Sequence, residues 1–222
     1  MKIAIDGPVG AGKSTISDAV AKALGILHLD TGAMYRAVGL SCLIRGVDIT
    51  DEARVTELTR SLTLDVRYED GVQRTLVDGW DVTGGIRTET VGLAASKVGT
   101  YAGVRRAMVA AQQAIARKTS MLMDGRDIGT VVLPDADVKI FLTASAEERA
   151  RRRWRDLQAA GKPDTYEKVL RDLRERDDQD THRAVDPLTV AKDAVVLDTT
   201  EMDFDRSVAE ILRIVKEAQD RG

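Results

Sequence analysis

The chain has 222 residues, of which 43 % are hydrophobic, a length that suits one globular domain with an insertion or two lobes. Its net charge of −3 gives no electrostatic attraction toward nucleic acid or an anionic membrane, so any basic cluster must be a local site. The single cysteine, Cys42, excludes an internal disulfide and a multi-thiolate metal site, and it favours a reducing, cytoplasmic location.

The predicted elements alternate between strands and helices along most of the chain. Strands are expected at residues 2–6, 26–30, 120–124, 137–142 and 194–198. Helices are expected at 14–24 and 33–45, and again from Ala146 and from about Phe204. This alternation predicts an α/β fold with a parallel sheet covered by helices on both faces. No apolar run approaches the length of a membrane span, and we expect neither a targeting peptide nor a membrane segment.

One region interrupts this alternation. Residues 62–84 show partial period-two patterning around the turn signals "EDG" and "DGWD", which predicts a small antiparallel hairpin or meander. A helical region at about 89–117 leads back to the sheet. We therefore predict an inserted lobe at 36–105, within a core formed by 1–35 and 106–222.

A phosphate-binding loop follows the first predicted strand. The segment "GPVGAGKS" matches G-x-x-x-x-G-K-[ST] in full, between a predicted strand and a predicted helix. Its glycines let backbone N–H groups approach phosphate oxygens, Lys13 places a charge near the β and γ phosphates, and Ser14 can ligate Mg²⁺. A glycine-rich turn without function is the alternative, which the complete motif and its context disfavour. The expected ATP-binding residues are Gly7, Pro8, Val9, Gly10, Ala11, Gly12, Lys13, Ser14 and Thr15.

A second polar segment follows the second predicted strand. "LDTGAMYRA" places Thr31, Tyr35 and Arg36 at a strand end and the start of a helix. A hydroxyl, a phenol and a guanidinium there suit a second phosphate, which arginine can bind through two hydrogen bonds. The alternative is a simple cap by Thr31 with Arg36 in solvent.

The strand at 120–124 ends in "MDGRD". In open α/β sheets ligands bind beyond the carboxyl ends of the strands, so Asp124, Arg126 and Asp127 should face the ligand. Asp124 is expected to hold a water of the Mg²⁺ shell. A surface ion pair between Arg126 and Asp127 is the alternative.

Two arginine-rich segments follow, "ERARRRWRDLQ" at 148–158 and "RERDDQDTHRAVDPL" at 174–188. The second contains Arg176, Asp180 and Arg183. Arginines that close over a transferred phosphoryl group stabilise its negative charge. For the first segment, the alternative is a solvated helix face or a nucleic-acid patch. Acidic neighbours and the negative net charge disfavour nucleic acid.

Taken together, "IAIDGPVGAGKST", "LDTGAMYRA", "MDGRDIGTVVLPDADVKIFLTAS", "ERDDQD" and "RAVDPL" resemble the bacterial cytidylate kinase family, the CMP kinases among the nucleoside monophosphate kinases. The resemblance covers nearly the whole chain in order. It implies a P-loop kinase fold with a five-stranded parallel sheet, a monophosphate-binding lobe enlarged by a small β insert, and a mobile lid at about 149–165. It implies transfer from MgATP to CMP or dCMP.

The resemblance also assigns roles to residues. It implies that the monophosphate is held by Tyr35, Arg36, Arg126 and Arg183, and Thr31 is also expected to bind CMP. It implies that the pyrimidine is read by Ser96, Arg105 and Asp127, and that the ribose is contacted by Arg176 and Asp180. The lid arginines Arg151 and Arg153 would close on ATP. For Ser96 the alternative is a purely structural role as a helical serine.

Base chemistry agrees with this implied preference, because an Asp127 carboxylate beside an Arg105 guanidinium complements the amino donor and the acceptors of cytosine. Uracil reverses two of these three positions and would leave polar groups unpaired. A related kinase acting on UMP or AMP is one rival, and a nucleotide-dependent switch is another. With no seam for a dimer in the sequence, we expect a monomer whose partners are ATP and CMP or dCMP.

Overall fold

The computed structural model describes residues 1–162 and 164–220, and it divides into two compact units. The first unit comprises Met1–Ile26 and Leu122–Gly222, and the second comprises Leu27–Met121. This division reflects contacts within each unit and does not test the predicted lobe boundaries. The boundaries at residues 36 and 105 therefore stay a prediction. The expected lid at 149–165 includes residue 163, which lies outside the described residues.

The predicted five-stranded parallel sheet is confirmed. Its strands lie in the order β2 (Leu27–Asp30), β6 (Met121–Gly125), β1 (Lys2–Asp6), β7 (Val138–Thr143) and β8 (Val195–Asp198). β1 pairs with β7 in parallel from Ile3 opposite Val138 to Asp6 opposite Phe141. Strands covered on both faces have nearly continuous apolar sequences, as β6 does with "MLM".

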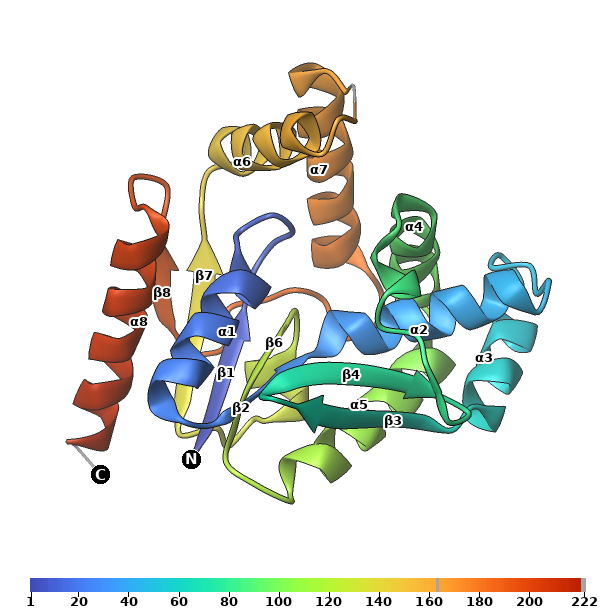
Figure 1. Cartoon of the computed structure of the whole chain (residues 1–222), viewed down its shortest axis with the longest axis horizontal. Helices are drawn as coiled ribbons and strands as arrows, with labels where there is room; N and C mark the ends of the chain where they lie inside the picture. Colours follow the sequence, from blue (N-terminus) through green and yellow to red (C-terminus); the bar gives the residue numbers. More distant parts are fainter. Residues whose placement is uncertain (163, 221–222) are drawn as a thin grey trace. The chain divides into compact units, whose positions relative to one another are not determined.

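Helices and strands of the first unit share one apolar core. α1 (Lys13–Leu24) contacts α8 (Phe204–Gln219), and both contribute to a cluster with the sheet residues Ile3, Ile5 and Ile140. α6 (Ala146–Ala159) and α7 (Tyr166–His182) pack on each other through a separate, smaller apolar cluster. Figure 1 shows that α6 continues from the carboxyl end of β7, next to the loop between β1 and α1.

The second unit is mainly helical and contains the predicted meander. Its helices are α2 (Thr31–Ile44), α3 (Glu52–Ser61), α4 (Glu89–Val98) and α5 (Ala102–Ala116), with a short 3₁₀ turn at Gly85–Arg87. A three-stranded antiparallel sheet is formed by β3 (Leu64–Glu69), β4 (Val72–Val77) and β5 (Trp80–Asp81). The turn between β3 and β4 has positive φ at Asp70 and Gly71, the geometry that "DG" favours in hairpins.

Sequence patterns left out several features of the structure. The helical region at 89–117 is two helices, with Gly99 and Tyr101 in the break. α3 and α7 were not predicted, and a short π-helical turn at Ile128–Val132 follows the "DGRD" segment. Among the described residues, no helix has both the length and the apolar character to span a membrane.

α2 and α4 approach each other closely because Gly39 has no side chain. A Cβ at this position would lie 2.9 Å from the backbone nitrogen of Ala95 and 3.1 Å from the Ala94 side chain. The two helices can therefore pack at this distance only with glycine there.

Gly39→Ala should lower the free energy of unfolding by about 1–2 kcal/mol, because overpacking against backbone outweighs the better helix propensity of alanine. Gly84→Ala is the matched control, since its φ is −71° and an added Cβ meets nothing within 4 Å. Urea unfolding of both variants measures the effect, and equal stability of the two would contradict this account of the helix contact.

Candidate active site

The loop between β1 and α1 has a backbone that only glycine permits. Gly10 and Gly12 have φ of 76° and 82°, and Gly12 caps α1. At Gly7, an added Cβ would lie 1.9 Å from the carbonyl oxygen of Leu142. The loop therefore lies tightly against β7 and leads into the N-terminus of a helix, where backbone N–H groups bind anions.

Lys13 is buried at the start of α1, with 6 % of its surface exposed. Its Nζ donates to the carbonyl oxygen of Pro8 at 2.7 Å, so the amine lies over the loop itself. Burial and, to a smaller extent, the charge of Arg126 lower the pKa of Lys13 to about 7, against the opposing effect of Asp124. A phosphate at this position would restore the charge that burial disfavours.

The two residues predicted to serve a magnesium ion lie together. Ser14 Oγ donates to Asp124 Oδ2 at 2.9 Å, and Asp124 is buried near the end of β6. Among the described residues no group of three or more His, Cys, Asp or Glu side chains could hold a metal. One hydroxyl and one carboxylate fit Mg²⁺ carried by a nucleotide, because this ion keeps several waters and phosphate ligands.

A chain of buried charges connects the loop after β6 with α7. Arg126 Nε donates to Asp180 Oδ2 at 2.7 Å, and Arg183 lies 3.7 Å from Asp180 Oδ1 and 3.9 Å from Asp127 Oδ1. The structure therefore brings together the predicted residues of the first unit. Arg126 pairs with Asp180, and the alternative of a surface ion pair with Asp127 is wrong. Arg183 also donates to the carbonyl oxygen of Asp186.

The charges in this cluster stabilise the ionised forms of Asp180 and Arg126. Burial alone would raise the pKa of Asp180, but Arg126, Arg183 and Arg176 outweigh it and hold the pKa below its ordinary value. Burial opposes the charge of Arg126, yet Asp180 and Asp124 raise its pKa overall. Half-buried Arg176 lies one helical turn before Asp180 on α7. Arg126 is thus held charged in a largely buried site, as recognition of a phosphate requires.

Arg149 was not singled out from the sequence, yet it contacts the phosphate-binding loop. With 5 % of its surface exposed, its guanidinium donates to the carbonyl oxygens of Val9 and Ala144 at 2.8 Å and to Asp177 at 2.7 Å. It joins the loop, the end of β7 and α7. Only its place in an arginine run hinted at it, because the partners lie up to 140 residues away.

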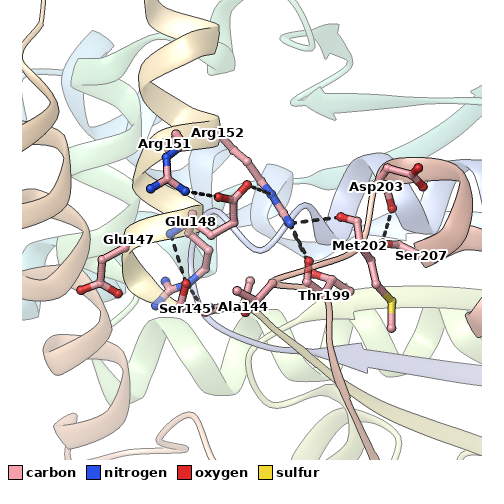
Figure 2. Close-up of polar contacts among 12 residues, drawn as sticks. Ala144, Ser145, Glu147, Glu148, Arg151, Arg152, Thr199, Met202, Asp203 and Ser207 are labelled. Carbon is pink, nitrogen blue, oxygen red and sulfur yellow. Dashed lines mark hydrogen bonds and ion pairs between the residues drawn. The ribbon is translucent and has the colours of Figure 1, made fainter.

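Neighbouring arginines of α6 have other contacts, which Figure 2 shows. Arg151 pairs with Glu148 on the helix surface, whereas Arg152 donates to Glu148 and to the carbonyl oxygens of Thr199 and Met202. Arg152 therefore joins α6 to the segment after β8. Arg153 is exposed. The expected contact of Arg151 and Arg153 with ATP stays a prediction.

In the second unit, the start of α2 differs from the alternative of a simple cap by Thr31. Asp30, not Thr31, caps the helix and accepts from the N–H of Ala33 at 3.1 Å, while Thr31 is buried in its first turn. Arg36 is half-buried, and its guanidinium lies against Gly92, where an added Cβ would be 3.0 Å from Nη1. The alternative of a solvent-facing Arg36 is therefore wrong.

Tyr35 and Arg105 also come together in this unit. The Arg105 guanidinium lies 5.5 Å from the centre of the Tyr35 ring, a cation–π distance, and donates to the carbonyl oxygen of Gly99 at 3.1 Å. Arg105 is 2 % exposed. Ser96 lies half-buried on α4. The roles of these residues in binding a nucleotide stay predictions.

Comparison with known proteins decides the family. The sequence model of cytidylate kinase matches residues 3–217. The chain belongs to the cytidylate kinase family. It is 46 % identical to a cytidylate kinase of Desulfitobacterium hafniense over 222 residues, covering 100 % of this chain and 95 % of the relative. It is also 46 % identical to a cytidylate kinase of Bacillus licheniformis, covering 98 % and 97 % of the two chains.

Structural comparison agrees at the level of the fold. A shikimate kinase from Bacteroides thetaiotaomicron aligns with a TM-score of 0.51 at 14 % identity, covering 97 % of this chain and 98 % of the other. The P-loop kinase fold expected from the sequence is therefore confirmed. As a member of the cytidylate kinase family, the protein is an ATP-dependent nucleoside monophosphate kinase.

Asp6, the last residue of β1, should make stability pH-dependent. Burial, together with the nearby charge of Asp127, raises the pKa of Asp6 to about 6. Hydrogen bonds from Gly129 and Ile128 and the charge of Lys13 oppose this rise. Because the folded pKa exceeds the ordinary 3.8, the native state binds the proton more tightly. Ionising Asp6 therefore costs about 2 kcal/mol of stability as the pH rises from 4 to 7.

Denaturant unfolding of the wild type and Asp6→Asn across this pH range measures that cost. The difference in unfolding free energy, wild type minus variant, should fall by about 2 kcal/mol as the pH rises from 4 to 7. Parallel curves for the two proteins would show that Asp6 titrates as an ordinary carboxylate.

Proposed function

We propose that this cytidylate kinase family member transfers the γ-phosphoryl group of ATP directly to CMP and dCMP, giving ADP and CDP or dCDP. The observation that carries the proposal lies in the first unit. There, a phosphate-binding loop with its Ser14–Asp124 pair occurs together with Arg126, which Asp180 holds charged, and with Arg183, 3.7 Å from Asp180. The loop suits a triphosphate donor, and the arginines suit a second, anionic substrate.

The donor side of the reaction needs charge neutralisation and positioning. Lys13 would lie against the phosphates, and the N–H groups at the start of α1 would bind their oxygens. Ser14 and Asp124 would hold Mg²⁺, which, when bound, neutralises charge on the transferred phosphoryl group. These residues fit the ion by their chemistry and by their separation of 2.9 Å.

The acceptor side is proposed to use the residues that the family resemblance assigns to the monophosphate and the ribose. Arg126 and Arg183 would bind the acceptor phosphate with Tyr35 and Arg36, and Arg176 and Asp180 would contact the ribose. Because the acceptor is already an anionic phosphate, no strong general base is required. Catalysis would then come from in-line positioning of two phosphates and from fixed positive charge in a dry site.

The base is proposed to be read by Asp127, Arg105 and Ser96. A carboxylate accepts from the cytosine amino group, and a guanidinium donates to its acceptors. The burial of Arg105 supports this proposal, because a buried guanidinium held by the Gly99 carbonyl and the Tyr35 ring has little freedom to adapt to another base.

An assay of ADP release with MgATP and, separately, CMP, dCMP, UMP and AMP tests the function. Fast turnover confined mainly to CMP and dCMP is expected, and Lys13→Ala should lower kcat by at least about 100-fold while CMP binding persists. Lys22→Ala, on the exposed part of α1, is the control. ATP hydrolysis indifferent to every acceptor would make the protein a nucleotide-dependent switch.

Asp127→Ala should reduce the preference for CMP over UMP, measured as the ratio of kcat/KM values, by about ten-fold or more. A lost carboxylate removes the acceptor for the cytosine amino group but leaves the arginines that bind phosphate. Asp178→Ala on α7, where the carboxylate is largely exposed, should leave the ratio unchanged. An unchanged ratio in both variants would exclude Asp127 from base recognition.

A further inference from the structure

Asp6 has no part in the function proposed above, yet it is one of the most thoroughly buried carboxylates of the first unit, with 4 % of its surface exposed. Each of its two oxygens accepts a hydrogen bond from backbone. Oδ1 accepts from the N–H of Ile128 at 2.8 Å, and Oδ2 accepts from the N–H of Gly129 at 2.7 Å. The carboxylate therefore reaches across 122 residues of sequence to a single short turn.

That turn directly follows two residues proposed to bind the acceptor nucleotide. Ile128–Val132 forms a π-helical turn that begins immediately after Arg126 and Asp127. The first N–H groups of a helix have no partner within it and are usually satisfied by the side chain of the N-cap residue. Here the N-cap is Asp127, whose side chain makes no such bond. Asp6 supplies the cap instead, so the Asp127 carboxylate lies toward Arg183 rather than on its own helix.

The position of Asp6 is fixed by the sheet. It lies opposite Phe141 in the parallel register of β1 and β7, and the next residue, Gly7, lies against the Leu142 carbonyl. The main chain of Asp6 thus leads into the ATP-binding loop, whereas its side chain holds the turn that follows the acceptor residues.

Gly129 lets the turn come close enough for this contact. A Cβ at position 129 would lie 3.3 Å from Asp6 Oδ2 and 3.3 Å from Cδ of Lys139 on β7. Both distances are tighter than ordinary contacts, so a larger residue would push the turn away from the carboxylate. Asp6 and Gly129 therefore depend on the same close approach.

We propose that Asp6 is a positioning residue for the acceptor nucleotide, because it fixes the turn from which Arg126 and Asp127 extend. The identity of the acceptor as CMP rests on the proposed function. Asparagine cannot replace this carboxylate, since it offers one acceptor oxygen and turns an NH₂ group toward the other N–H. Glutamate is one methylene too long for a site buried against the sheet.

Asp6→Asn and Gly129→Ala each test the proposal from one side of the contact. Each should raise the KM for CMP about ten-fold, because a displaced turn misplaces both acceptor residues, and should change the KM for ATP less than about two-fold. The double variant should raise the KM for CMP by much less than the product of the single effects, as expected for two residues that share one contact.

Asp137→Asn is the matched control. Its carboxylate also accepts a backbone N–H across the β1–β7 pair, from Lys2 at 2.6 Å, but at the opposite end of the strand. Both KM values should remain at their wild-type levels in this variant. If Asp6→Asn does not fold, Gly129→Ala alone carries the test, since it adds one methyl group and leaves every ionisable group in place.

An equal rise of both KM values, or independent effects in the double variant, would overturn the positioning role. Loss of stability with both KM values unchanged would reduce Asp6 to a structural residue. Failure of the proposed function is distinguishable, because it is seen in the wild type. If the wild type prefers another monophosphate, the KM for that acceptor takes the place of the KM for CMP.

Discussion

The parallel pairing of β1 with β7 is the constraint on which the rest of this site depends. It places the Gly7 backbone so close to the Leu142 carbonyl that no side chain fits, and it fixes Asp6 one residue earlier. From this point the main chain enters a loop shaped for phosphate, while the Asp6 side chain binds the turn after β6. The residues of the first unit that are predicted to bind the donor and the acceptor thus both connect to the end of β1. A shift of a single residue in the register would displace both.

Buried charge is the second determinant. Lys13, Arg126 and Asp180 are all withdrawn from water, and desolvation opposes ionisation of each. The outcomes differ because the partners differ: Arg126 and Asp180 stabilise each other, whereas Lys13 has only a backbone carbonyl at hydrogen-bond distance in the described contacts. The cluster is therefore left with positive groups whose most favourable partners are anions. A phosphoryl group meets that requirement, as family membership independently demands.

Sequence patterns predicted what local geometry determines. The loop glycines require positive φ, the "DG" turns fit a hairpin, and apolar periodicity placed the sheet strands within one or two residues. Contacts between distant segments could not be predicted in this way. The bonds from Asp6 to the π-helical turn and from Arg149 to Val9 span 122 and 140 residues, and no local pattern signals either. Family resemblance supplied candidate roles for Arg105 and Ser96, although the burial of Arg105 is visible only in the structure.

The arginine run on α6 shows how far helical geometry can sharpen such a prediction. Successive residues of a helix are rotated by about 100°, so residues four apart share a face and residues two apart lie on nearly opposite faces. Arg149 is bonded to the ATP-binding loop, which defines the face of α6 that lies on the donor side. Arg153 lies one turn further on that same face and is exposed, whereas Arg151 points away and pairs with Glu148. Arg152 is occupied by the segment after β8. Of the two lid arginines expected from the sequence, the helical period therefore makes Arg153 the better candidate for the predicted contact with ATP.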